Sequence, residues 1–226
     1  FTSKKAASFI EVDFLLFLID ILNKMKKYKK KEIRGSKKLF ELSKRDNCFF
    51  IPLVVEPKRS TGSRKYLNGN KINILSVGKY RDYKNPYVLV DALSLLPAGY
   101  RELVSVTYVG QCSKPEEQNY YDKLKDYIES KGLSDIISLR KNVPFSEMES
   151  IYLGNDVFIL TSKVETCSVA IPEAMSYGLL TISTNQNGSA SYIDQWSGYT
   201  FKTCDPASLS NVLQNICANI EIVQEM

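Results

Sequence analysis

Short apolar runs alternate with longer amphipathic segments along the chain from residue 71 onward. The apolar runs predict strands at 72–77, 104–109, 136–139, 156–160, 180–183 and 199–201. The segments between and after them predict helices at 85–96, 115–131, 146–153 and 206–220, and in the stretch that contains Glu173. Strands that alternate with helices of roughly ten residues form βα units, whose strands pair in parallel. The expected fold class is therefore α/β, a doubly wound, Rossmann-like parallel sheet.

Capping residues mark the ends of several predicted helices. Gly132 and Gly178 each follow a helical segment, and glycine readily adopts the left-handed backbone that ends a helix. Ser146 predicts the start of the 146–153 helix, because a serine hydroxyl can accept a hydrogen bond from an unpaired N–H of the first turn.

A different pattern precedes residue 71. Residues 9–25 are strongly apolar, but acidic residues interrupt the run and it falls short of the ~20 residues of a membrane span, so we interpret it as a buried or docked helix. A short helix is predicted at 37–45 and a strand at 47–51, before a polar, turn-rich stretch. We therefore expect a partial N-terminal helical and strand segment at 1–57, a linker at 58–70 and the α/β domain at 71–226.

The charge is divided unevenly between these parts. The net charge of +5 combines 17 Lys/Arg against 7 Asp/Glu in residues 1–70 with 13 against 18 in residues 71–226. Many of the basic residues fall within 24–45. A solvated helix face and loop would account for them, as would peripheral contact with anionic lipid at the inner face of a membrane. A nucleic-acid partner is not expected, because no binding motif is present.

The cysteine and histidine content excludes several classes of catalytic and metal-binding site. Five scattered cysteines without a C-x-x-C pair indicate reduced thiols and a cytoplasmic protein. The chain has no histidine, which excludes histidine metal ligands and a histidine general base within it. No carboxylate cluster suits a metal, so no metal or other cofactor is expected. Neither the dinucleotide fingerprint nor the P-loop pattern occurs, which disfavours nicotinamide-dependent oxidoreduction and P-loop hydrolysis.

The stretch 161–178 carries the most specific pattern. It follows a predicted buried strand and places Glu165 in a loop and Glu173 about one turn into the next helix. We expect both carboxylates to face one crevice at the carboxyl end of that strand. The residues that follow the first glutamate are Thr166, Cys167, Ser168 and Val169. Their backbone N–H groups are expected to bind phosphate or sugar oxygens, because amides at a helix start are unpaired. Two ordinary surface carboxylates are the simpler alternative.

Further loops open at the same edge. Gly78 lets the chain turn sharply after the first strand, and the ammonium groups of Lys79 and Lys84 can then neutralise a diphosphate without a metal. The loop after the third strand has Arg140 at its start, and its backbone can bind the edge of a base. The turn at 187–189 is a further candidate for the lining. A solvated charged loop and ordinary strand-to-helix connections are the alternatives.

The string S-x-x-E-x7-E-A-M-x-x-G, at 162–178, resembles the signature of the retaining, nucleotide-sugar-dependent glycosyltransferases of the family 4 (group 1) class. Residues 71–220 look like the C-terminal, donor-binding half of a two-domain (GT-B) enzyme of that class. The resemblance implies that Lys79 and Lys84 hold the donor diphosphate and that Glu165 contacts the transferred sugar.

The resemblance also implies positions for the nucleoside. Glu173 would contact the ribose, and the base would lie on the loop that contains Arg140, Asn142 and Val143. The chain departs from the class in two places. Thr-Cys-Ser follows Glu165 where Gly-Phe-Gly is usual, and Asn85 stands where glycine is common.

The implied activity is transfer of a sugar from a nucleotide diphosphate sugar to a glycan, lipid-linked or surface-polysaccharide acceptor. The acceptor-binding groups of the class lie in an N-terminal domain, of which residues 1–57 would be the tail. We therefore expect the chain to bind the donor and to be inactive alone. Two other functions remain open on the same fold, because fold does not determine function. They are a nucleotide- or sugar-binding module without turnover, and a sugar-nucleotide epimerase or phosphorylase-like enzyme.

Overall fold

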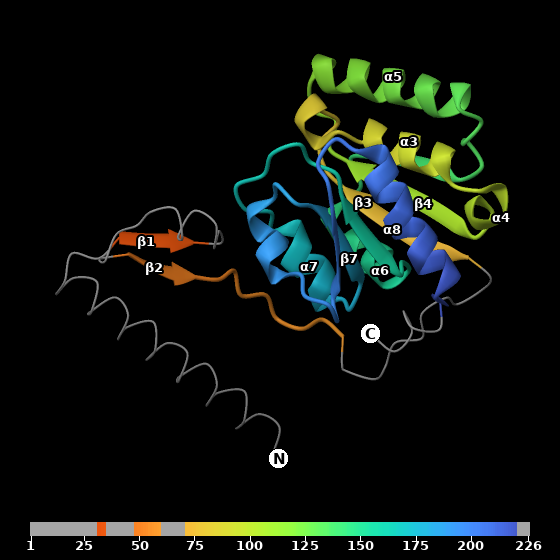
Figure 1. The fold of residues 1–226 in the computed structure, drawn as a ribbon. Coiled ribbons are helices and arrows are strands. Elements are labelled where there is room, and N and C mark those ends of the chain that lie inside the picture. The colour runs from red at the N-terminus through yellow and green to blue at the C-terminus, as the bar shows by residue number, and fades with distance from the viewer. Residues whose placement is uncertain (1–30, 35–47, 60–70, 221–226) are drawn as a thin grey trace, which may run out of the picture. The chain divides into compact units, whose positions relative to one another are not determined.

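The computed structural model describes residues 31–34, 48–59 and 71–220 (Figure 1). The chain divides into two compact units, Phe1–Pro52 and Leu53–Met226. The helices predicted at 9–25 and 37–45, and most of the predicted linker, lie outside the described residues. The proposed domain boundaries stay a prediction.

The described part of the first unit is a pair of parallel strands. β1 (Lys31–Arg34) pairs with β2 (Cys48–Ile51). The strand predicted at 47–51 is thereby confirmed. The basic region was interpreted as a helix face and loop, and this is wrong for residues 31–34, which form β1. The strand pairs with β2, which lies more than ten residues further along the chain, so the local sequence pattern did not reveal it.

The second unit is built on a parallel sheet. Within the described residues the sheet has six strands in the order β5-β4-β3-β6-β7-β8, and every neighbouring pair is parallel. The strands are β3 (Ile72–Val77), β4 (Val104–Gly110), β5 (Ile137–Lys141), β6 (Val157–Leu160), β7 (Leu180–Thr184) and β8 (Gly198–Phe201). The chain runs outward from β3 to β5 and then returns to β6 on the other side of β3. This reversal is the point at which doubly wound sheets bind ligands, outside the carboxyl ends of the strands.

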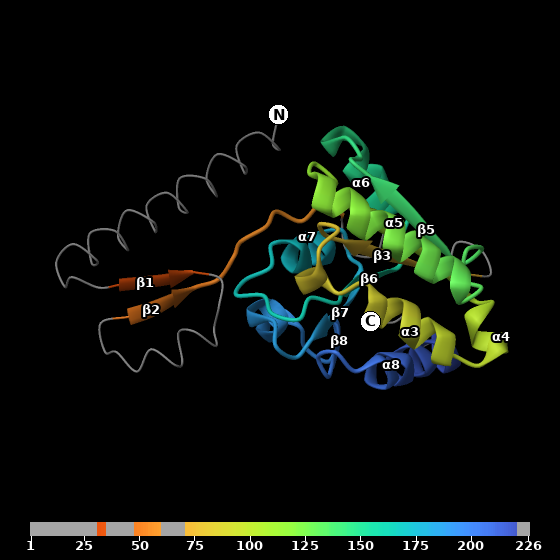
Figure 2. The ribbon, with the colours of Figure 1, turned by 90° about the horizontal axis from the view of Figure 1, so that it is seen from above.

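Helices cover both faces of the sheet. They are α3 (Tyr87–Leu95), α4 (Ala98–Arg101), α5 (Pro115–Ser130), α6 (Phe145–Leu153), α7 (Ala170–Ser176) and α8 (Pro206–Ala218), with short 3-10 turns η1 (Asp82–Lys84) and η2 (Gly188–Tyr192). The helices α3, α5 and α8 contribute to one core cluster, and α6 and α7 to another. α3 and α8 pack side by side (Figure 2).

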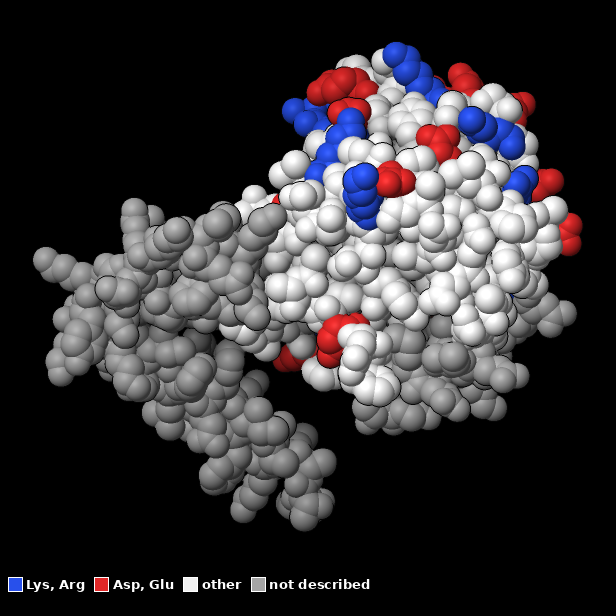
Figure 3. All heavy atoms as spheres, in the orientation of Figure 1, with Lys and Arg blue, Asp and Glu red and all other residues white. Residues whose placement is uncertain are grey.

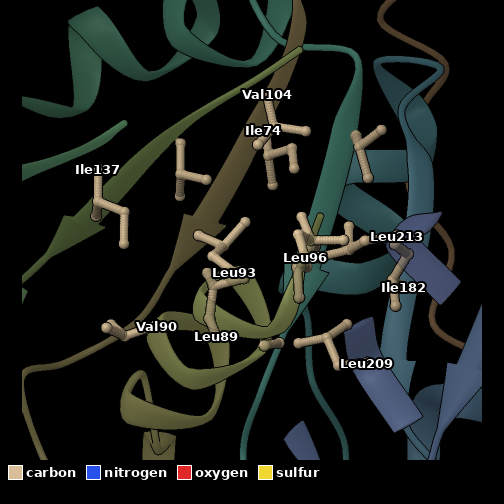
Figure 4. Packing of buried hydrophobic residues seen from close by; sticks show 14 of the residues in the cluster. Ile74, Leu89, Val90, Leu93, Leu96, Val104, Ile137, Ile182, Leu209 and Leu213 are labelled. Carbon is tan, nitrogen blue, oxygen red and sulfur yellow. The ribbon is translucent and has the colours of Figure 1, made fainter. Parts of the chain in front are cut away.

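The two core clusters follow from the alternation of side chains along each strand. Ile74 and Leu75 are neighbours on β3, are both fully buried, and belong to different clusters. Figure 4 shows the first cluster, where Leu89 and Leu93 of α3 and Leu209 of α8 gather beside the strands. A parallel sheet needs such cover on both faces, which explains the nearly continuous apolar runs of its strands.

The predicted α/β class and all six predicted strands of this unit are confirmed, with ends within a few residues. Two helix starts differ. The predicted 85–96 helix begins only at Tyr87, after η1 and a left-handed Asn85. The N-cap of α6 is Pro144 rather than Ser146. Proline cannot donate a backbone hydrogen bond, so it fits the start of a helix, where no acceptor is available.

The distribution of charge on the surface follows from the sequences of the helices. α8 contains no charged residue, and the surface seen in Figure 3 is largely uncharged between the scattered lysines, arginines and acids. Across the described ranges, none of the helices combines the length and the apolar character that crossing a bilayer requires.

Candidate functional site

A cavity of about 560 Å³ opens where the sheet reverses direction. It is lined by Val77, Gly78, Lys79, Tyr83, Lys84, Val109, Gly110, Gln111, Asn142, Val143 and Ala170. These residues come from the carboxyl ends of β3, β4 and β5, the loops after them, and the first turn of α7. Both charged residues in this lining are lysines. The cavity is therefore shaped from several strand ends and carries positive charge.

Two glycines let the backbone form one wall of this cavity. A Cβ atom on Gly110 would lie 2.6 Å from the carbonyl oxygen of Gly78 and 2.5 Å from the ring of Tyr80. A Cβ atom on Gly78 would lie 3.0 Å from the hydroxyl oxygen of Tyr108 and 3.3 Å from Cδ of Lys84. A side chain at Gly110 would clash with the backbone of Gly78, and one at Gly78 would crowd the side chains of Tyr108 and Lys84.

Lys84 and Glu165 form an ion pair at the edge of the cavity. The Nζ of Lys84 lies 2.8 Å from Oε2 of Glu165, and the two side chains are only 14% and 18% exposed. The carbonyl oxygen of Lys84 accepts a 2.7 Å hydrogen bond from the Thr161 hydroxyl at the end of β6. The strand ends on both sides of the reversal therefore hold this lysine.

A second set of contacts joins the same two loops. The amide of Lys163 donates to the carbonyl oxygen of Tyr83 at 2.8 Å. The Lys163 ammonium lies 2.7 Å from both carboxylate oxygens of Asp82, in a pair that is largely exposed. The loops after β3 and β6 are thus tied together beside the cavity.

The loop after β5 is held by Asn142. Its backbone is left-handed, with φ of 53°. Its side-chain oxygen accepts from the amide of Cys112 at 2.8 Å, and its side-chain nitrogen donates to the carbonyl oxygen of Cys112 at 2.9 Å. The side-chain amide of Asn142 therefore adds two hydrogen bonds beyond the end of the β4–β5 pairing. Two residues of this loop, Asn142 and Val143, line the cavity. The Arg140 guanidinium is not in the lining and lies 3.1 Å from Glu147.

Glu173 lies in a second, smaller hollow of about 250 Å³. The lining of that hollow is Lys58, Phe145, Ser146, Met148, Glu149, Glu173, Ser176 and Tyr177. The buried Tyr152 hydroxyl donates to Oε2 of Glu173 at 3.0 Å. Burial and this neighbouring carboxylate raise the pKa of Tyr152 well above its usual range, so the hydroxyl stays a donor.

Neither of the two cavities formed by the described residues is lined by both glutamates, although a common crevice was expected: Glu173 lines the smaller one, and Glu165 pairs with Lys84 beside the larger one. α7 buries Ile171 and Ala174 against the sheet, and this rotation turns Glu173 toward Tyr152. Ala170 on the same helix lines the first cavity, so the two hollows lie along one helix.

The loop between the two glutamates is braced by the turn at η2. The buried amide of Ser168 donates to the Ser189 hydroxyl at 2.8 Å, and the Ser189 hydroxyl lies 3.6 Å from the Cys167 sulfur. Thr166 and Val169 are exposed. None of the four residues 166–169 is in the lining of the larger cavity.

Several residues of the site were not predicted. Gln111 directly follows β4, so its position after a strand end would have found it. Tyr83 and Ala170 carry no comparable signal. In the described part of the chain, no group of three or more Cys, Asp or Glu side chains is placed to hold a metal ion.

Comparison with known proteins supports a family assignment. Residues 59–226 match the model of the family described as glycosyl transferases group 1. The chain is 24% identical over 171 residues to the D-inositol 3-phosphate glycosyltransferase of Paenarthrobacter aurescens, an alignment that covers 75% of this chain and 41% of the relative. The chain thus spans less than half the length of that relative.

Solved structures share the fold. A glycosyltransferase from Rickettsia africae superposes with a TM-score of 0.69 at 20% identity, over 90% of this chain and 61% of its own. The Anabaena protein HepE, solved in complex with UDP-glucose, superposes with a TM-score of 0.60 at 18% identity, over 69% of this chain and 41% of its own. The family match, which covers most of the chain, agrees with the resemblance found in the sequence: this chain belongs to the group 1 glycosyltransferases.

Proposed function

We propose that this chain is the donor-binding half of a retaining glycosyltransferase, which moves a sugar from a nucleotide diphosphate sugar to an acceptor. The observation that carries the proposal is the cavity at the reversal of the sheet, whose charged lining residues are Lys79 and Lys84. A diphosphate at this place would meet two ammonium groups and the backbone of Gly78.

Charge on the leaving diphosphate is the chemical reason for two lysines. When the bond between the sugar and the diphosphate breaks, negative charge develops on the diphosphate. Fixed positive groups stabilise that charge in the transition state. Because ammonium groups can supply this stabilisation, we expect no metal requirement. That the structurally similar HepE was solved with UDP-glucose supports a nucleotide sugar as the ligand class.

For the other site residues we propose the roles that the resemblance implies. We assign the sugar to Glu165 and the backbone of 166–169, the ribose to Glu173, and the base to the loop with Arg140, Asn142 and Val143. Because both side-chain groups of Asn142 are hydrogen-bonded to Cys112, the base would be read by the backbone of this loop.

The acceptor and the setting of the protein are also part of the proposal. We expect a glycan, a lipid-linked sugar or a surface polysaccharide as acceptor. The enzyme would work in the cytoplasm, with its basic segment at 24–45 against the inner face of the membrane. Because the chain covers only 41% of the relative from Paenarthrobacter aurescens, we assign donor binding to this chain and propose that transfer also needs an acceptor-binding domain.

Calorimetric titration of this chain with UDP, GDP and ADP, without added metal, tests the proposal. We expect saturable binding of one of the three, and a loss of at least roughly fivefold in affinity for Glu173→Ala, because a charged acceptor is removed. Glu129→Ala removes an exposed carboxylate of α5 and serves as the control, with unchanged affinity. Binding of none of the three diphosphates, or binding that EDTA abolishes, would contradict the proposal.

A further inference from the structure

The Lys84–Glu165 pair occupies the place where the proposed diphosphate would be neutralised. Lys84 lines the cavity, yet its ammonium already lies 2.8 Å from a carboxylate. The pair is well shielded, with side chains 14% and 18% exposed, whereas the Lys163–Asp82 pair between the same loops is 37% and 80% exposed. The cavity therefore contains one lysine that carries a built-in counter-ion.

We infer that Glu165 is an exchangeable counter-ion, which makes the site prefer an intact sugar nucleotide over the spent nucleoside diphosphate. This inference rests on the proposed function. Before a donor binds, Glu165 neutralises Lys84. An arriving diphosphate takes Lys84 from Glu165, and the released carboxylate then accepts a hydrogen bond from a hydroxyl of the donor sugar.

Electrostatics favours exchange over sharing. A phosphate oxygen close enough to bind Lys84 would bring a second negative charge within a few ångströms of the Glu165 carboxylate, and like charges at that distance repel. A carboxylate with little access to solvent is destabilised when it loses its partner. The carboxylate must therefore find a new donor once the diphosphate is bound.

Only one of the two ligands supplies that donor. The hydroxyl groups of the donor sugar can donate to a carboxylate. In a nucleoside diphosphate without its sugar, the group beside Lys84 and Glu165 is the negatively charged terminal phosphate, because the ribose is assigned to Glu173. The unpaired carboxylate therefore weakens binding of the free diphosphate. In the complex with the sugar nucleotide, the hydrogen bond from the sugar offsets this loss. After transfer, the same effect would favour release of the spent nucleotide.

Glu165→Gln tests the exchange. The amide keeps the size of the side chain and removes its charge. We expect the variant to bind the preferred free diphosphate (UDP, GDP or ADP) roughly three- to tenfold more tightly than the unmodified chain. Its affinity for the matching sugar nucleotide (UDP-glucose, GDP-mannose or ADP-glucose) should rise less or fall, so the ratio of the two affinities shifts toward the free diphosphate.

Asp82→Asn is the matched control. It makes the same change in charge, on the other ion pair between the same two loops, and Asp82 is not in the cavity lining. We expect it to leave the ratio of the two affinities unchanged. An equal shift in Asp82→Asn would mean that overall charge, not the counter-ion of Lys84, sets the preference.

The affinity for the free diphosphate is the decisive measurement, because this ligand contains no sugar and the result does not depend on which sugar the enzyme uses. Weaker or unchanged binding of the diphosphate by a folded Glu165→Gln would overturn the exchange and leave Glu165 as a support that orients Lys84. If the unmodified chain binds neither diphosphates nor sugar nucleotides, the proposed function itself fails, and that result is distinct from a failure of the exchange.

Discussion

Two asparagines beside the cavity show how single residues shape its loops. Asn85 and Asn142 have left-handed backbones, with φ of 47° and 53°. Asparagine tolerates this conformation better than most side chains. Asparagine can therefore occupy position 85, where glycine is common in the class that the sequence resembles. Asn142 adds two side-chain hydrogen bonds to Cys112 that a glycine could not make.

At the same scale, Tyr152 is expected to position Glu173 for the ribose. Tyr152→Phe keeps the ring, which stacks on Tyr177 at 4.8 Å, and removes the hydroxyl that donates to Glu173. Loss of one such hydrogen bond should weaken nucleotide binding by roughly two- to tenfold.

A double-mutant cycle separates this role from a general effect on folding. In a Glu173→Ala background, Tyr152→Phe should have no further effect on nucleotide affinity, because its partner is gone. Tyr127→Phe, which loses a 2.6 Å hydrogen bond to Asp91 on another helix, is the control with unchanged binding. An undiminished effect of Tyr152→Phe in the absence of Glu173 would contradict the positioning role.

At the scale of elements, α5 is anchored to the loop that leads into η1. Glu117 in the first turn of α5 is buried and accepts hydrogen bonds from the amides of Ser113 at 2.8 Å and Lys114 at 3.2 Å. It also lies 2.7 Å from Nε of Arg81. One carboxylate thus caps a helix and holds the residue just before η1.

These contacts predict a dependence of stability on pH. The Ser113 amide, and then the Arg81 guanidinium, hold the pKa of Glu117 below its ordinary value of 4.5. A carboxyl group with a lowered pKa in the folded state stabilises the protein above its unfolded-state pKa, and that stabilisation is lost as the pH falls through the folded-state pKa. The loss should therefore begin near pH 4.5 and grow below it.

Urea unfolding at pH 7 and at acidic pH measures this effect. The difference in free energy of unfolding between the unmodified chain and Glu117→Gln should be larger at pH 7 and shrink below the ordinary pKa of 4.5. Glu129→Gln, at an exposed position on the same helix, should show a small difference at both pH values. A Glu117→Gln difference that stays constant with pH would rule out the charged group as its source.

At the scale of the whole molecule, the described part of the second unit contains the six-stranded parallel sheet, the two core clusters and the two cavities. The first residues of this unit, from Leu53 onward, form hydrogen bonds with the rest of the unit. The amide of Leu53 donates to the Tyr192 hydroxyl, and the amide of Lys58 to the carbonyl oxygen of Ser176. This unit therefore has the contacts that a separately folding domain requires.

Removal of residues 1–52 tests this autonomy. We expect the truncated protein, residues 53–226, to unfold cooperatively and to bind the preferred nucleoside diphosphate with the affinity of the longer chain. Circular dichroism melting and calorimetry are the measurements. A second truncation that starts at residue 60 also removes the contacts of Leu53 and Lys58, and should lower the melting temperature. Loss of nucleotide binding on removal of residues 1–52 would show that the first unit completes the site.

The sequence by itself determined the six strands of the second unit, most of its helices and the edge of the sheet at which the site lies. Periodicity is a local property, so apolar runs such as 72–77 and 180–183 predict strands without knowledge of their partners. Gly78 and Lys79 directly follow a strand and Lys84 lies in the loop after it, which predicts a place at the carboxyl edge of a parallel sheet. All three residues line the cavity found there.

Only the tertiary structure decided which of these residues meet. The partners Lys84 and Glu165 are 81 residues apart, and their pairing depends on β3 and β6 being neighbours at the reversal of the sheet. Glu173 faces Tyr152 because α7 is oriented with Ile171 and Ala174 buried. Strand order and helix rotation arise from the packing of the whole core. No short window of sequence contains that information, so the sequence predicted the edge of the sheet, and the fold determined how its residues pair.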